Sequence, residues 1–298
     1  MFTQFFGNYL LERHLLTMDQ LGEVLNRLKH VRARLGVLAI DAGYMTGEQV
    51  EQIHSLQLKQ DKRFGELAVQ EGFLTVAQLE ELLGNQSSSY LALSQVLVDK
   101  GFFTYDQMAD LLREFKEQRN ISDQEFEALK NDDMEAMVDV FLKLNQSEEN
   151  RLYRDAFLSF VKNTFRFVES NFRFSQGEVV EQVAFKRLVF TTMNGSYDLF
   201  MGLAGEQDVI EQFALRFSEG LGIDDIEMQD SLGEFLNVTC GLFLASLSNQ
   251  GIDLELQPPT LCQEKALLRG QTLFRIPVHL PFGRIDFIFA EGIPAIAG

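Results

Sequence analysis

Two segments near the N-terminus repeat one set of residues that suits the binding of a small anion. Each segment begins with Arg, a large apolar residue and Gly, and each ends with Gln; the segments are residues 34–57 and 63–86. The Arg guanidinium is a planar fork of donors that fits a phosphate oxygen or the edge of a guanine base. Gly lets the backbone approach a ligand closely, and the Gln amide supplies both donor and acceptor groups. Two complete copies therefore predict a ligand that itself has two-fold symmetry.

These segments resemble the MshEN domain, the N-terminal cyclic di-GMP-binding domain of type II secretion and pilus ATPases, whose motif also occurs twice with a short spacer. Cyclic di-GMP is a compact two-fold ring with two phosphates and two guanines, so each copy of the motif can meet one half of it. The resemblance implies that the ligand contacts are Arg34, Leu35, Gly36, Gln57, Arg63, Phe64, Gly65 and Gln86, and that Gly43, Gly72, Leu79 and Leu83 support or line the site.

The match to the MshEN motif has departures that bear on affinity. Phe64 stands where the family has Leu, Ala39 and Ala68 stand where it has larger aliphatic residues, and His54 stands where it usually has Leu. Hairpins that pack together and bind nothing remain the alternative explanation of the repeated pattern.

A second pair of residues that could take part in catalysis lies near residue 235. Glu234 and Asn237 are three positions apart, so they share one face of an expected helix. Asn is unfavourable inside helices, and this one stands in an apolar stretch. We therefore expect Asn237 to make a buried hydrogen bond or to have a functional role.

This helix resembles that of the CheX/CheC family of chemotaxis phosphatases, in which Asp or Ser precedes a Glu-x-x-Asn pattern and a Pro follows. Asp230, Glu234 and Asn237 match, and Pro258 and Pro259 lie close to the family's Pro position. The resemblance implies that Asn237 orients a water molecule for in-line attack on the aspartyl phosphate of a response regulator, and that Glu234 pairs with a Lys of that partner.

Such catalysis depends mainly on positioning and charge stabilisation, and any Mg²⁺ would belong to the partner. We expect no intrinsic cofactor and no metal ligands. Only one such helix is apparent, so a binding or dimerisation role without activity is the alternative. By analogy with the family, a homodimer is plausible.

The first site belongs to a repeat with a period of 29 residues, and its copies occupy residues 5–28, 34–57, 63–86 and 92–115. Each copy predicts a short apolar helix, which ends at a Gly in three copies, and a second helix that begins after Thr17, Thr46, Thr75 or Thr104. Such a hairpin cannot bury its own apolar face, so the copies should stack. The outer copies have Phe5 and Ala92 in place of Arg and are interpreted as structural caps.

These patterns predict an all-α helical-repeat domain at residues 1–120, an acidic helical connector with a solvated face at 121–150, and an α+β domain with a mostly antiparallel sheet at 151–298. In the α+β domain we expect a helix that includes residues 153–165, strands at 183–193 and 197–203 around an Asn194-Gly195 turn, helices at 206–219 and 227–247, and strands at 252–256, 272–279 and 284–290.

Composition excludes several classes of protein. The net charge of −18 repels phosphate backbones, so neither DNA nor RNA is an expected partner. Cys240 and Cys262 are the only cysteines, which excludes a disulfide framework, and both are interpreted as small apolar residues. The N-terminus lacks the features of a signal peptide, and no apolar stretch is long enough to span a membrane. A cytoplasmic location without membrane insertion is therefore expected.

The sequence as a whole predicts a cytoplasmic cyclic di-GMP receptor that couples nucleotide binding to a CheX-like output domain. Its expected partner is a response regulator or another protein of chemotaxis, motility, pilus or secretion signalling. Two alternatives remain, namely a response-regulator phosphatase tuned by the nucleotide and a scaffold that binds no nucleotide.

Overall fold

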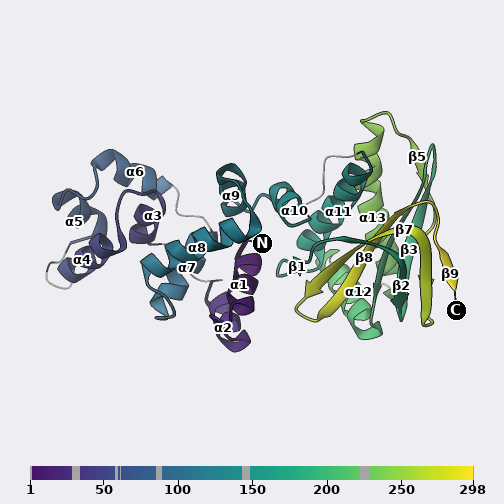
Figure 1. Cartoon of the computed structure of the whole chain (residues 1–298), viewed down its shortest axis with the longest axis horizontal. Coiled ribbons are helices and arrows are strands. Elements are labelled where there is room, and N and C mark those ends of the chain that lie inside the picture. Colours follow the sequence, from purple (N-terminus) through teal and green to yellow (C-terminus); the bar gives the residue numbers. More distant parts are fainter. Residues whose placement is uncertain are drawn as a thin grey trace. The chain divides into compact units, whose positions relative to one another are not determined.

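The computed structural model describes residues 2–28, 34–57, 60, 62–84, 89–142, 148–221 and 228–297. The chain divides into two compact units, one of residues Phe2–Asp133 and one that begins at Met134 (Figure 1). The described part of the first unit contains helices, and the second unit combines helices with an antiparallel sheet, as the predicted fold class requires. The boundary between the units falls inside residues 121–150, the expected connector.

Four helical hairpins make up most of the first unit, one for each predicted repeat. Their helices are α1 (Phe2–Glu12) and α2 (Met18–Leu28), α3 (Leu35–Asp41) and α4 (Gly47–Gln57), α5 (Phe64–Gln70) and α6 (Val76–Gly84), and α7 (Ser89–Asp99) and α8 (Tyr105–Arg119). A further helix, α9 (Asp123–Lys130), follows the fourth hairpin. The hairpin form of the repeat is thus confirmed.

Every hairpin turns at the same position of the repeat. The backbone there is left-handed, with φ of 55° at His14, 70° at Gly43, 76° at Gly72 and 72° at Gly101. Gly adopts this conformation without strain, which explains its presence in three of the copies.

The second helix of each hairpin begins with a reciprocal cap. The Thr hydroxyl accepts a hydrogen bond from the N–H of a Gln three residues later, at 3.2 or 3.3 Å, and the Gln side chain accepts one from the Thr N–H at 2.8 Å. Each such capping box satisfies two backbone donors that the helix itself cannot pair. The Thr caps are Thr17, Thr46, Thr75 and Thr104, as predicted.

The first and last hairpins meet through an aromatic cluster. Phe2, Phe6 and Tyr9 of α1 surround Phe115 of α8, with ring centroids 5.2 to 6.1 Å from that of Phe115. All four side chains are buried. The outer copies therefore pack against each other, and α7 of the last hairpin also packs on α3 of the second, so the prediction that both outer copies cap the array is wrong for the last one.

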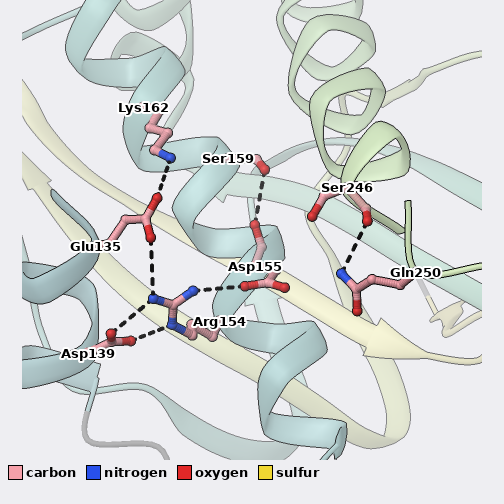
Figure 2. Close-up of polar contacts among 8 residues, drawn as sticks. All are labelled: Glu135, Asp139, Arg154, Asp155, Ser159, Lys162, Ser246 and Gln250. Carbon is pink, nitrogen blue, oxygen red and sulfur yellow. Dashed lines mark hydrogen bonds and ion pairs between the residues drawn. The ribbon is translucent and has the colours of Figure 1, made fainter. Parts of the chain in front are cut away.

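The second unit begins with α10 (Met134–Leu142) and α11 (Glu148–Phe167), which are joined by ion pairs (Figure 2). Arg154 of α11 binds Asp139 of α10 through two nitrogen atoms and Asp155 at 2.9 Å. Glu135 accepts a hydrogen bond from Lys162 at 2.9 Å. Glu135 and Asp139 remain exposed, as predicted for the acidic residues of this segment, and they form these ion pairs at the surface.

The strands of the second unit come before and after two further helices, α12 (Gln207–Leu221) and α13 (Met228–Ser248). Its strands are β1 (Arg173–Phe174), β2 (Glu178–Phe185), β3 (Arg187–Gly195), β4 (Asp198–Gly205), β5 (Leu254–Leu256), β6 (Thr260–Cys262), β7 (Ala266–Leu280), β8 (Gly283–Glu291) and β9 (Ala295–Ala297). The strand order is β1-β7-β8-β4-β3-β5, while β2 and β9 also pair with β7 and β6 pairs with β3. The described pairings are antiparallel.

Both faces of this sheet are apolar, because alternate residues of a strand point to opposite sides. Phe287 and Phe289 of β8 contact Phe160 of α11 and Phe243 of α13, with ring centroids 5.1 and 5.7 Å apart. The intervening Ile288 belongs to a second buried cluster, formed with residues of β2, β3, β4 and β7. Helices α11, α12 and α13 thus pack on one side of a sheet that also has an apolar cluster on its other side (Figure 1).

Two predictions for the sheet are wrong in detail. Residues 183–193 do not form one strand, because the chain leaves β2, which pairs with β7, and enters β3, which pairs with β4. The turn between β3 and β4 lies at Ser196-Tyr197, since Asn194 pairs with Asp198. Gly195 has a different role, because a Cβ there would lie 2.7 Å from the carbonyl oxygen of Asp253. The short strands β1, β6 and β9 were not predicted.

Helix α13 also differs from the prediction about membrane-spanning stretches. Residues Gln229–Ser248 are long and apolar enough to cross a membrane, with a mean hydropathy of 1.2. The helix packs against α11, α12 and the sheet, and Phe235, Cys240 and Phe243 are fully buried. Burial raises the pKa of the Cys240 thiol to about 12, which keeps this side chain neutral and apolar. The position of α13 in the core accounts for its apolar composition.

Candidate functional sites

The rotation of α13 about its axis is determined by contacts near its N-terminus. The buried Ser231 hydroxyl donates to the Ala214 carbonyl of α12 at 2.7 Å. Phe235 packs against Phe213, with ring centroids 4.8 Å apart. These contacts turn one side of α13 inward and leave Glu234 exposed on the other side.

Glu234 and Asn237 lie side by side on this surface, as their spacing predicts. Asn237 is half-buried, and its Nδ2 lies 3.5 Å from Oε2 of Glu234. Within the described part of the chain, this long contact is the one hydrogen bond of the Asn237 side chain. The buried side-chain hydrogen bonds described for this helix belong to Ser231 and to Thr239, whose hydroxyl accepts from Asn163 of α11 at 3.0 Å. A buried hydrogen bond therefore does not explain Asn237.

The turn between β5 and β6 brings a proline next to this pair. The N–H of Gln257 donates to the Thr192 carbonyl of β3 at 2.9 Å, which holds the turn against the sheet. A Cβ on Gly233 would lie 3.6 Å from the Pro259 ring, so Pro259 contacts the residue that precedes Glu234. The sequence spacing alone did not determine which proline lies beside Glu234 and Asn237.

The surface around Glu234 offers a carboxylate and an amide. An amide can orient a water molecule through its donor and acceptor atoms, and a carboxylate can pair with a cation. Asp230 is also exposed on this helix, one turn before Glu234. Among the described residues, no group of three or more His, Cys, Asp or Glu side chains could hold a metal ion.

The second candidate site lies on the second and third hairpins and begins with two arginines. Arg34 and Arg63 directly precede α3 and α5, and their φ and ψ angles are −79° and 154°, and −73° and 152°. Both residues are exposed. The two copies therefore present their guanidinium groups from equivalent positions with the same backbone conformation.

The residues that follow the arginines pack reciprocally. A Cβ on Gly36 would lie 3.2 Å from the Phe64 ring and 2.8 Å from Val50 Cγ1, and a Cβ on Gly65 would lie 3.1 Å from Leu35 Cδ2. The second residue of each motif thus covers the glycine of the other. The missing side chains of Gly36 and Gly65 serve this close packing of the two hairpins.

The end of the first motif lies beside the start of the second. The Gln57 side chain donates to the Lys62 carbonyl at 3.3 Å, which places the amide next to Arg63 in the chain. Gln86, the corresponding residue of the second motif, lies outside the described residues.

The residues that were predicted to support or line the nucleotide site differ in their burial and in their structural roles. Gly43 and Gly72 provide the left-handed turns that end α3 and α5. Leu79 is half-buried against Gly65, whereas Leu83 has 54% of its surface exposed. The α6 surface therefore includes an apolar side chain that is available to a ligand.

Asp99 is a residue of this site that the sequence patterns did not single out. Its Oδ1 on α7 lies 3.1 Å from Nη1 of Arg34 and accepts a hydrogen bond from Gln95 at 2.7 Å. In the repeat, position 99 corresponds to Asp41 of the second copy, which is also engaged, with Lys130 at 2.8 Å. The sequence feature that could have identified Asp99 is the acidic residue at the same repeat position in the second and fourth copies, Asp41 and Asp99.

Residues 188–282 match the profile of the family described as chemotaxis phosphatase CheX. The matched segment contains β3 to β7, and with them α13 and the turn that carries Pro259. Residues 188–282 are therefore CheX-like. The match leaves the helical hairpins uncovered.

Several solved structures are similar to this chain. A CheX from Desulfovibrio desulfuricans is 14% identical, with a TM-score of 0.41, and the alignment covers 48% of this chain and 99% of that one. A CheX from Vibrio vulnificus is 13% identical, with a TM-score of 0.42, 48% of this chain and 99% of that one. The Borrelia burgdorferi CheX in a CheX-CheY-BeF3-Mg²⁺ complex is 13% identical, with a TM-score of 0.36, 52% of this chain and all of that one. No curated protein matches the chain.

Proposed function

We propose that this chain is a two-part signalling protein. Its CheX-like domain acts on the aspartyl phosphate of a response regulator, and its helical hairpins bind cyclic di-GMP. The observation that carries the proposal is the CheX match over residues 188–282, which includes the accessible pair Glu234 and Asn237. Both the nucleotide and the regulator are cytoplasmic molecules, so the proposal includes a cytoplasmic location.

In the phosphatase reaction, the Asn237 amide orients a water molecule in line with the bond between phosphorus and the aspartyl oxygen. Glu234 pairs with a cationic side chain of the regulator, which positions the two proteins. The 3.5 Å contact between these side chains is weak, so exchanging it for new contacts costs little. The regulator supplies the phosphoryl group and Mg²⁺, and this chain supplies orientation.

The test is the decay of a phosphorylated response regulator with the full chain present. We expect Asn237→Ala to lower the acceleration by about a hundredfold, which is the usual cost of removing one oriented hydrogen-bonding group from a reaction centre. Asn249→Ala is the matched control, because Asn249 is exposed just beyond the C-terminal end of α13. Equal decay rates with wild type and Asn237→Ala would exclude the catalytic role.

Nucleotide binding is the second part of the proposal, and the paired arginines favour it. Arg34 and Arg63 are exposed at equivalent places, and the reciprocal packing of Leu35 and Phe64 is what a two-fold relation between two motifs produces. A ligand with two phosphates can engage one guanidinium with each. The exposed Leu83 offers apolar surface to a base.

Calorimetric titration of the full chain with cyclic di-GMP tests this part. We expect Arg34→Ala and Arg63→Ala each to weaken binding by about tenfold or more, since each removes charge-assisted hydrogen bonds. Arg113→Ala is the control, because Arg113 is an exposed arginine of the same unit that pairs with Asp110. Unchanged affinity in both motif variants would reject the site.

Two other outcomes would replace parts of this proposal. A chain that binds the regulator without accelerating its dephosphorylation would support a binding or dimerisation role for the α13 surface. If calorimetric titration detects no binding of cyclic di-GMP, the result would support a scaffold whose hairpins serve only packing.

A further inference from the structure

The two arginines of the repeated motif are equivalent in sequence but differ in their electrostatic surroundings. Arg34 forms an ion pair with Asp99, at 3.1 Å from Nη1 to Oδ1. No carboxylate in the described part of the chain lies within ion-pair distance of the Arg63 guanidinium. A duplicated motif for a symmetric ligand would be expected to have equal halves, so this difference needs a physical explanation.

The position of the fourth hairpin explains the difference. Helix α7 packs against α3, the helix that Arg34 precedes, and it presents Asp99 at its last residue. The central hairpins thus meet a neighbour on the side of the first motif, and that neighbour supplies a carboxylate. The asymmetry arises because α7 of the fourth hairpin packs on the second hairpin, which carries Arg34, and so places Asp99 beside the first motif.

Asp99 is held in place by a buried side chain. Gln95, one turn earlier on α7, is fully buried, and its Nε2 donates to the same Asp99 oxygen at 2.7 Å. The Oε1 atom of Gln95 is buried without a hydrogen-bond partner among the described residues. The Asp99 side chain is itself only 20% exposed, whereas that of Arg34 is 61% exposed. The carboxylate is therefore the anchored member of the pair and the guanidinium is the accessible one.

We infer that Asp99 is an internal competitor for the anion-binding group of the first motif; this inference rests on the proposed nucleotide binding. A phosphate that approaches Arg34 meets a guanidinium already neutralised by a fixed carboxylate, and it is repelled by that carboxylate at short range. The Arg63 guanidinium has no ion-pair partner in the described chain, and the nearby Glu66 carboxylate accepts a hydrogen bond from the Arg63 backbone N–H, at 3.3 Å, instead. The two halves of the site are thus unequal, with Arg63 as the stronger phosphate group and Asp99 as the residue that lowers affinity at Arg34.

The test is calorimetric titration of the full chain with cyclic di-GMP, in wild type and in Asp99→Asn. The Asn side chain keeps the size of Asp and an oxygen that can accept from Gln95, so the variant removes charge with little change of packing. We expect Asp99→Asn to bind about fivefold more tightly or better, because one like charge near a phosphate is removed. We also expect Arg63→Ala to lose more affinity than Arg34→Ala.

Glu117→Gln is the matched control, because it removes one exposed negative charge from α8 in the same unit and should leave the affinity unchanged. Asp99→Ser provides a second charge-removing variant if Asp99→Asn folds poorly, as judged by its circular dichroism. Wild-type binding that both Asp99 variants leave unchanged or weaken would overturn this inference alone. The absence of binding in wild type and in every variant would overturn the nucleotide-binding proposal and this inference with it.

Discussion

Glycines of the hairpin unit have opposite effects on stability according to their surroundings. Gly36 is buried, and a Cβ there would lie 2.8 Å from the methyl group of Val50, which is itself buried and β-branched. Gly22 of α2 has no atom within 4 Å of such a Cβ. The first glycine is therefore required by packing, and the second only adds conformational freedom to the unfolded chain.

We predict that Gly36→Ala lowers the free energy of unfolding by about 1–3 kcal/mol, because a stiff Val side chain cannot move away. Gly22→Ala is the matched control and should raise it by up to about 1 kcal/mol, since Ala favours the helix. Urea unfolding followed by circular dichroism measures both changes. Stabilisation by Gly36→Ala would show that the hairpins do not pack as closely as described.

Between helices, one network of charges joins α10 to α11 of the second unit. The Arg154 side chain is only 27% exposed and contacts Asp139 and Asp155, while Glu135 accepts from Lys162. The Asp139 and Asp155 carboxylates raise the pKa of Arg154 above its already high usual value, so it stays charged at all relevant pH. Shared partners make such a network stronger than an isolated surface pair.

We predict that Arg154→Gln lowers the free energy of unfolding of this unit by about 1–2 kcal/mol, because it leaves the Asp139 and Asp155 carboxylates without their common cation. The effect should shrink as salt is raised from low to high concentration. Lys186→Gln is the control, since the Lys186–Glu206 pair is more than half exposed and should contribute nothing measurable. Thermal unfolding of wild type, Arg154→Gln and Lys186→Gln measures these changes. Equal losses of stability in the two variants would contradict the prediction.

For the molecule as a whole, the proposal joins a nucleotide site in one compact unit to a phosphatase surface in the other. Coupling between two binding sites is reciprocal by thermodynamic necessity. If cyclic di-GMP changes the affinity for the phosphorylated regulator, the regulator must change the affinity for cyclic di-GMP by the same factor. This relation can be tested without knowing whether the nucleotide activates or inhibits.

We predict that saturating phosphorylated regulator shifts the dissociation constant for cyclic di-GMP by about fivefold or more, the lower end of measured couplings. The shift should disappear in Glu234→Gln, which weakens regulator binding, and persist in Asn249→Ala. Titration calorimetry with and without the regulator provides the measurement. An identical constant in both conditions would mean that the two units work independently.

Local features of this chain were predictable from its sequence. The hairpin repeat, its Thr caps and its glycine turns depend on interactions between residues less than one repeat apart, such as Thr46 with Gln49. The shared face of Glu234 and Asn237 follows from the geometry of one helix. The order of helices and main strands in the second unit was predictable for the same reason, because hydrophobic periodicity reports which face of an element is buried.

Other features arise from contacts between residues that are far apart in the chain. The division of residues 183–193 into β2 and β3 depends on which strand each half pairs with, and an apolar run does not encode that choice. The placement of Pro259 beside Gly233, the ion pair of Arg34 with Asp99 and the accessibility of Asn237 likewise depend on how separate elements pack. Short-range propensities therefore specified the elements and the candidate residues, whereas long-range packing settled the surroundings of each candidate residue.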